Sequence, residues 1–130
     1  MKIRTDFVTN SSSSSFVIAY RNKAQDESTD KPALARRFND IVRLVMEACQ
    51  HYDTEPAEIY STRRQIDHRP VGERLEDFYP NDFAERIKQY IDNGYTIAIK
   101  EVSYHDELTR ELLYLLADND QDFIILDDDE

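Results

Sequence analysis

The last third of the chain constrains the fold most strongly, because it alternates a strand, a helix and a second strand. Residues 95–102 have a β-strand pattern that begins directly after Gly94. Leucines at three- and four-residue steps predict a helix over residues 105–117, with an apolar face made by Leu108, Leu112, Leu115 and Leu116. Residues 123–126 follow as a buried strand bounded by acids. Such a crossover predicts two parallel strands in one sheet, with a right-handed connection.

A long amphipathic helix is predicted over residues 30–52. Asp30 is a suitable N-cap, and Pro32 falls in the first turn, where its missing N–H costs nothing. The expected buried face consists of Leu34, Phe38, Ile41, Val42, Val45, Met46 and Cys49. Cys49 is the only cysteine, and its place on this face favours a buried structural thiol over a nucleophile.

Three shorter helical segments are predicted between this helix and Gly94. The start signal at residues 54–56 predicts a short helix that continues through Ala57, Ile59 and Ile66. A helical turn is expected over residues 73–79, and Pro80 breaks it. Asn81 then caps a helix that ends at Asn93-Gly94, and its apolar face is Phe83, Ile87, Tyr90 and Ile91.

Two N-terminal segments complete the predicted fold. Residues 2–8 and 15–20 have strand patterns, and the polar residues 9–14 between them could close a hairpin. The sequence therefore predicts a single α/β domain over residues 1–130. It would contain a mixed sheet of three or four strands with helices packed on it, and a C-terminal β-α-β unit.

Composition limits the functions that such a domain could have. The net charge is −11, and the last thirteen residues hold seven acids and no base. This charge disfavours nucleic acid as a partner and favours basic ones. No apolar run approaches the roughly 20 residues that span a membrane. A single cysteine fits a reducing compartment, so the expected location is cytoplasmic, with no membrane contact.

The run Ser11, Ser12, Ser13, Ser14 and Ser15, preceded by Asn10, is the stretch that ordinary packing explains least. The basic residues Lys2, Arg4, Arg21 and Lys23 flank it, so hydroxyl donors and positive charge could together bind a phosphate or a carboxylate. The run lacks the glycines that open a backbone phosphate cradle. A solvated hairpin tip and a phosphorylated segment are the alternatives.

The opening of the chain also resembles a known sequence signature. Lys2-Ile3-Arg4, Phe7-Val8-Thr9-Asn10, the serine run and Phe16 are similar to the N-terminus of a scattered group of uncharacterised bacterial and phage-associated proteins. The match covers about seventeen residues, so it supports a hypothesis at the level of a short motif. The group has no known activity, so the resemblance implies only that the serine run is not a random linker, which favours a recognition or processing role for it.

Two charged segments are further candidates. Arg63, Arg64, His68, Arg69 and Arg74 form a basic segment that could bind an anion or pair with the acidic tail. The final acids Asp127, Asp128 and Asp129 follow an apolar strand and are candidate ligands for a divalent metal ion, although a solvated tail explains them more simply. The phosphate-binding loop of nucleotide hydrolases is absent from the sequence, which excludes that class.

These features favour a non-enzymatic interaction or binding module that uses the serine loop, needs no cofactor and binds a protein partner. Tyrosines are enriched at association surfaces, so self-association into a homo-oligomer is a further hypothesis. The candidate interface tyrosines are Tyr52, Tyr60, Tyr79, Tyr90 and Tyr95. The alternative is a small phosphate- or divalent-metal-dependent enzyme built on the C-terminal acids. A third hypothesis is an acidic mimic of nucleic acid, which would need carboxylates at regular spacing along one face.

Overall fold

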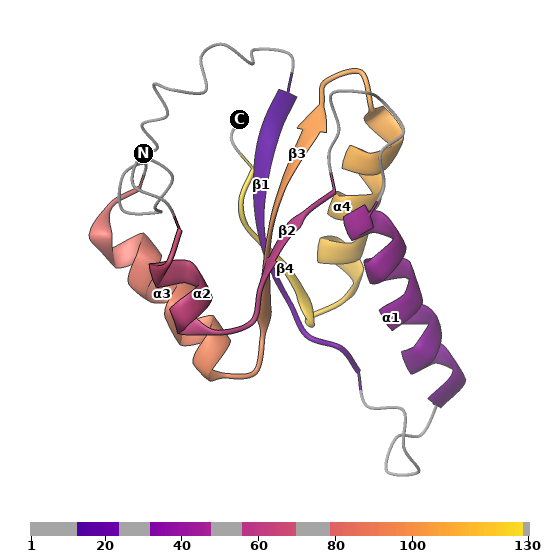
Figure 1. The fold of residues 1–130 in the computed structure, drawn as a ribbon. Helices are drawn as coiled ribbons and strands as arrows, with labels where there is room; N and C mark the ends of the chain where they lie inside the picture. Colours follow the sequence, from indigo (N-terminus) through magenta and orange to yellow (C-terminus); the bar gives the residue numbers. More distant parts are fainter. Residues whose placement is uncertain (1–12, 24–31, 48–55, 70–78, 129–130) are drawn as a thin grey trace.

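The computed structural model describes residues 13–23, 32–47, 56–69 and 79–128 of the 130-residue chain. Within these ranges the chain forms four strands and four helices (Figure 1). In chain order they are β1 (Ser13–Tyr20), α1 (Pro32–Glu47), β2 (Glu58–Tyr60), α2 (Arg63–Asp67), α3 (Asn81–Asp92), β3 (Thr96–Ser103), α4 (Glu107–Asn119) and β4 (Phe123–Asp127). The α/β class is therefore confirmed.

The sheet has the order β2-β3-β1-β4, and each neighbouring pair is antiparallel. Because β3 and β4 both run against β1, they are parallel to each other, as the crossover predicts. The prediction of a mixed sheet is nevertheless wrong, since β1 lies between them and no described neighbours are parallel. The connection from β1 through α1 to β2 likewise passes over one strand, because β3 lies between β1 and β2. Two interleaved crossovers of this kind make the split β-α-β topology, also called ferredoxin-like, with α2 and α3 added between β2 and β3.

Helices cover both faces of the sheet. Figure 1 shows α1 and α4 on one face and α2 and α3 on the other. Strand side chains alternate between these faces, so β1 contributes to two cores. Phe16 and Ile18 pack with Val42 and Leu113 under α1 and α4, whereas Val17 and Ala19 pack with Ile66 and Ile87 under α2 and α3.

Most predicted elements are confirmed with shifts of a residue or two at their ends. The predicted strand 95–102 is β3, the helix 105–117 is α4, and the strand 123–126 is β4. Gly94 has φ 89°, the left-handed conformation expected after α3. Asn81 is the first residue of α3 rather than its cap, because Pro80 occupies the N-cap position.

The short helix predicted through residues 57–66 is wrong in its first half. Glu58–Tyr60 form the edge strand β2, because this segment pairs with Ile97 to Ile99 of β3. The helix starts later, at α2, where Thr62 and Gln65 form a capping box. The predicted strand 2–8, the turn at residues 73–78 and the thiol of Cys49 lie outside the described residues.

The predicted apolar faces of α1 and α4 are only partly buried. Leu34 and Ile41 on α1 are 51% and 44% exposed, and Leu108 and Leu115 on α4 are 54% and 55% exposed. The sheet covers one side of each helix, and an apolar stripe wider than that side continues onto the outer surface. No helix in the described part of the chain is long and apolar enough to cross a membrane.

Candidate interaction site

The serine run ends inside the sheet and not in a loop. β1 begins at Ser13, and Ser14 and Ser15 are only 3% and 4% exposed. Ser15 stands opposite Glu101 of β3, and its Oγ donates a hydrogen bond to Glu101 Oε1 at 3.2 Å. Ser14 therefore belongs to the strand and not to the predicted loop over residues 9–14, because pairing with β3 extends further towards the N-terminus than strand propensity indicated. Neither serine is exposed in this fold, as a contact surface would require. Arg4, Asn10, Ser11 and Ser12 lie outside the described residues.

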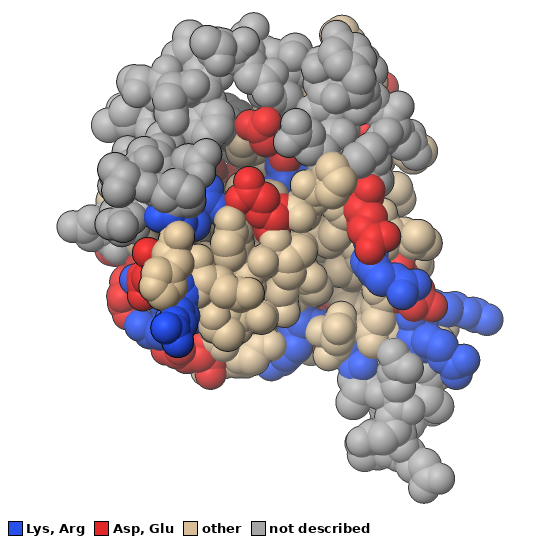
Figure 2. Space-filling view, in the orientation of Figure 1, with Lys and Arg blue, Asp and Glu red and all other residues tan. Residues whose placement is uncertain are grey.

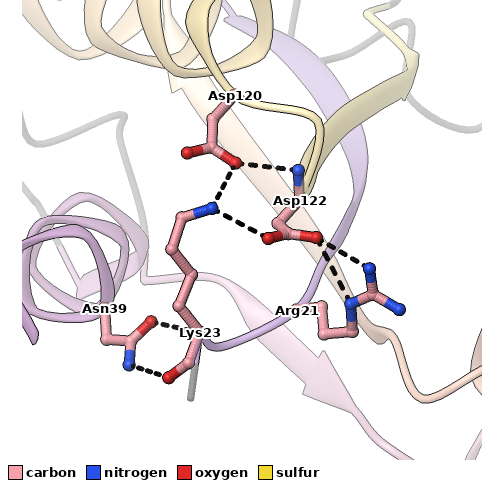
Figure 3. Close-up of polar contacts among 5 residues, drawn as sticks. All are labelled: Arg21, Lys23, Asn39, Asp120 and Asp122. Carbon is pink, nitrogen blue, oxygen red and sulfur yellow. Dashed lines mark hydrogen bonds and ion pairs between the residues drawn. The ribbon is translucent and has the colours of Figure 1, made fainter. Parts of the chain in front are cut away.

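The basic residues that follow the serines lie at the other end of β1. Arg21 follows Ser15 by six residue steps along an extended chain, a distance of about 20 Å. Arg21 Nη2 lies 2.9 Å from Asp122 Oδ1, and Lys23 Nζ lies 3.0 Å from Asp120 Oδ1 and 2.8 Å from Asp122 Oδ2 (Figure 3). The structure thus places Arg21 and Lys23 far from Ser15 and pairs them with Asp120 and Asp122.

This charged cluster joins three elements of the fold. The side chain of Asn39 on α1 accepts a hydrogen bond from Lys23 N at 2.7 Å and donates one to Lys23 O at 2.9 Å (Figure 3). Partial burial alone would raise the pKa of the Asp122 carboxyl, but the hydrogen bonds from Lys23 and Arg21 outweigh it and lower that pKa. The cluster therefore has a structural role, in which it fastens the end of β1 to α1 and to the turn before β4.

The arginine segment is also largely engaged within the chain. Arg63 Nε donates to Asp92 Oδ1 at 2.8 Å, which ties α2 to α3. Arg69 Nη1 donates to Glu58 Oε2 at 2.8 Å, next to the hydroxyl of Tyr60. Burial and the hydrogen bond to Glu58 raise the pKa of Tyr60 to about 12. Arg64 forms no ion pair with another described residue, and Arg74 lies outside the described residues.

The C-terminal acids turn towards different partners. Asp127 Oδ2 accepts a hydrogen bond from the Tyr79 hydroxyl at 3.1 Å, and Asp128 Oδ2 accepts one from the Tyr114 hydroxyl at 3.1 Å. Tyr79 packs with the core under α2 and α3, whereas Tyr114 packs with the core under α1 and α4. In the described ranges no three His, Cys, Asp or Glu side chains are grouped to hold a metal ion. Asp129 lies outside those ranges.

A groove that the sequence did not reveal lies between α1 and the edge strand β2. It encloses about 320 Å³, within the range of ligand-binding cavities. Its apolar lining consists of Tyr20, Val42, Met46, Pro56, Ala57 and Ile59, and its polar lining of Asn22, Asn39, Asp40, Arg43 and Glu47. Val42 and Met46 are almost fully buried, so they form the floor of the groove, while the exposed charged residues form its rim.

Helical spacing explains how α1 builds this wall. Asn39, Val42, Arg43 and Met46 recur at three- and four-residue steps, so they share the side of α1 that faces β2. A backbone hydrogen bond of 2.8 Å from Ala57 N to Met46 O holds the end of α1 over the start of this strand segment. The groove is therefore bounded by a fixed helix and a fixed strand edge.

The edge itself is open in the described sheet. β2 is the terminal strand, with β3 on one side only. Ile59 is 43% exposed although it belongs to a strand. Figure 2 looks onto this edge and shows uncharged surface, drawn tan, between charged groups on either side. Unpaired strand edges are templates for the pairing of another chain, and natural proteins usually protect them.

No family model, curated protein or solved structure matches this chain. The split β-α-β topology by itself does not identify a function, because folds of this kind support many unrelated activities. The candidate site therefore depends on its own geometry. The only sequence signal for it was the strand-like Glu58-Ile59-Tyr60, which the preceding helix-start signal obscured.

Proposed function

We propose that the protein is a non-enzymatic interaction module that binds a protein partner in the groove between α1 and β2. The observation that carries this proposal is a cavity of about 320 Å³ directly beside β2, which among the described strands has a neighbour on one side only. A cavity can accept an anchoring side chain, while the edge offers backbone donors and acceptors. This combination suits a polypeptide, which has side chains to fill the cavity and backbone groups to pair with the edge.

This proposal keeps the function class that the sequence favours and moves its contact surface. Ser14 and Ser15 are buried, and Arg21, Arg63 and Arg69 are paired with acids of the same chain. Ile59 offers an exposed branched side chain within the groove. It is therefore a better candidate for a binding residue than any described member of the serine run.

Selection from a displayed library of random peptides tests the proposal. Wild-type protein is expected to enrich a set of peptides, and Ile59→Glu, which puts a charge into the groove, is expected to reduce their binding by about tenfold or more, or ~1.4 kcal/mol. Leu115→Glu is the matched control, since Leu115 is similarly exposed but lies on α4. Circular dichroism would establish that both variants are folded.

Two outcomes would overturn the proposal. The first is a library that yields no enriched peptide against folded wild-type protein. The second is a set of enriched peptides that bind Ile59→Glu as well as wild type, or that depend on Leu115 instead.

A further inference from the structure

We propose that the occupant of the groove is an extended, basic segment of a partner protein, which adds a strand to β2. This inference rests on the proposed function and names the conformation and the chemistry of the bound segment. Three observations carry it: the position of β2 in the sheet, the side of the sheet on which the cavity lies, and the charge of the rim.

The position of β2 determines how a segment could bind. Its three residues pair with β3 through Glu58 opposite Ile99, Ile59 opposite Ala98 and Tyr60 opposite Ile97. A fifth strand on the outer side would use the backbone groups that face away from β3. Pro56 has no N–H, so it limits hydrogen bonding at the N-terminal end of this edge. The bound stretch is therefore short, about four or five residues.

The cavity lies on one defined face of that added strand. Ile59 stands opposite Ala98, which packs in the core under α1 and α4, and Ala57, two residues earlier, packs against the same core. Side chains of an added strand alternate in the same way, so every second one would point towards α1. An apolar side chain there would contact Val42, Met46 and Ile59, which line the groove.

The rim favours positive charge on the bound segment. Of the charged residues on the described part of the rim, two are acids, Asp40 and Glu47, and one is a base, Arg43, whose Nη2 is 3.5 Å from Asp40 Oδ1. The whole chain adds a net charge of −11, which attracts a cationic segment over a longer range. A lysine or arginine next to the apolar side chain that enters the groove therefore complements the charge of the rim and the net charge of the whole protein.

Five capped synthetic pentapeptides test the inference. The basic probe is Lys-Leu-Lys-Val-Lys, and its matched partner replaces each lysine with glutamate. Two N-methylated forms of the basic probe block alternate N–H groups, which point to opposite edges of an extended strand. A fifth peptide replaces the central lysine with proline. Binding is followed by changes in backbone amide NMR shifts of α1 and β2.

The inference expects the basic probe to bind, and the glutamate and proline peptides to bind about tenfold more weakly or not at all. One N-methylated form should lose binding while the other keeps it, because only one edge of the peptide would face β2. Asp40→Lys should weaken binding of the basic probe, whereas Asp118→Lys, an equal charge change on α4, should have much less effect.

Each contrary result has a distinct meaning. Equal binding of the basic and acidic peptides would overturn the charge assignment. Loss of binding with both N-methylated forms, or with neither, would overturn strand addition. If these pentapeptides fail but library peptides still depend on Ile59, the extended basic segment is wrong and the interaction module stands. If neither set depends on Ile59, both proposals fail.

Discussion

At the scale of single residues, burial separates side chains that look equivalent in the sequence. Leu113 and Leu115 lie two positions apart on α4, yet Leu113 is fully buried and Leu115 is 55% exposed. The three- and four-residue spacing of leucines had assigned Leu115 to the core and had left Leu113 out. The two residues therefore offer a direct test of the packing of α4.

We expect Leu113→Ala to reduce the free energy of unfolding by about 2–5 kcal/mol, because it leaves a cavity in the core under α1 and α4. Leu115→Ala should change it by no more than about 0.5 kcal/mol, since that side chain is half in solvent. Urea unfolding of both variants measures the difference. Equal losses would contradict this placement of α4 on the sheet.

The charged cluster around Asp122 gives a prediction about pH. Its carboxyl has a lowered pKa in the folded protein, so the cluster contributes stability at pH values above the ordinary aspartate pKa of about 3.9. That contribution is lost as pH falls through the lower, folded-state pKa. Asp122→Asn should therefore be less stable than wild type at pH 7, by about 1–3 kcal/mol.

The deficit of Asp122→Asn should shrink as the pH falls below about 4, where Asp122 becomes protonated first in the unfolded wild-type chain and, at lower pH, in the folded protein. Thermal unfolding across this pH range measures it. Asp118→Asn provides the control, because Asp118 is exposed and has no ion pair within the described part of the chain. A deficit that stays constant down to low pH would show that the cluster does not depend on the Asp122 charge.

At the scale of secondary-structure elements, β1 is the strand on which the rest of the sheet depends. It pairs with β3 along its whole length and with β4 over its second half. Its first residues are serines, which are weak strand formers compared with the Phe-Val-Ile that follows. They nevertheless join the strand because β3 offers a continuous partner as far as Ser103.

The burial of Ser14 and Ser15 makes a phosphorylated state of these two residues incompatible with the folded strand. Ser15→Asp, a phosphate mimic, should lower stability by about 2 kcal/mol or more, because it adds a buried carboxylate opposite Glu101. Ser15→Ala should cost only about 0.5–1.5 kcal/mol, the value of one hydrogen bond. Denaturant unfolding compares the two. Similar small losses would show that this end of β1 opens readily.

At the scale of the whole molecule, charge acts beyond any single ion pair. With a net charge of −11, the field of the protein should speed the association of a basic peptide with the groove. Raising the ionic strength from about 0.01 M to about 0.15 M shortens the screening length from about 30 Å to about 8 Å. The association rate of the basic pentapeptide should then fall by about tenfold or more.

Stopped-flow fluorescence with a labelled peptide measures this rate, and an uncharged peptide selected from the library is the control. Its association rate should hardly change with salt. A basic peptide whose rate is also insensitive to salt would argue against long-range attraction, although the local contribution of Asp40 would remain measurable through Asp40→Lys.

The sequence by itself determined which segments form helices and strands, because these depend on contacts within a few residues. Leucine spacing predicted α4, alternating β-formers predicted β3, and Gly94 marked the end of α3. The same local signals failed at Glu58-Ile59-Tyr60, which is a strand only because β3 lies beside it. The net charge and the serine run can also be read directly from the sequence.

Only the tertiary structure decided the order of the strands, the coverage of each helix and the position of the candidate site. β1 lies between β3 and β4, so residues that are far apart in the chain bury Ser14 and Ser15. The groove likewise needs α1 and β2 to meet, and the two share no local pattern. Such features depend on the packing of distant segments, which hydrophobic periodicity does not encode because it specifies a face and not the partner that covers it.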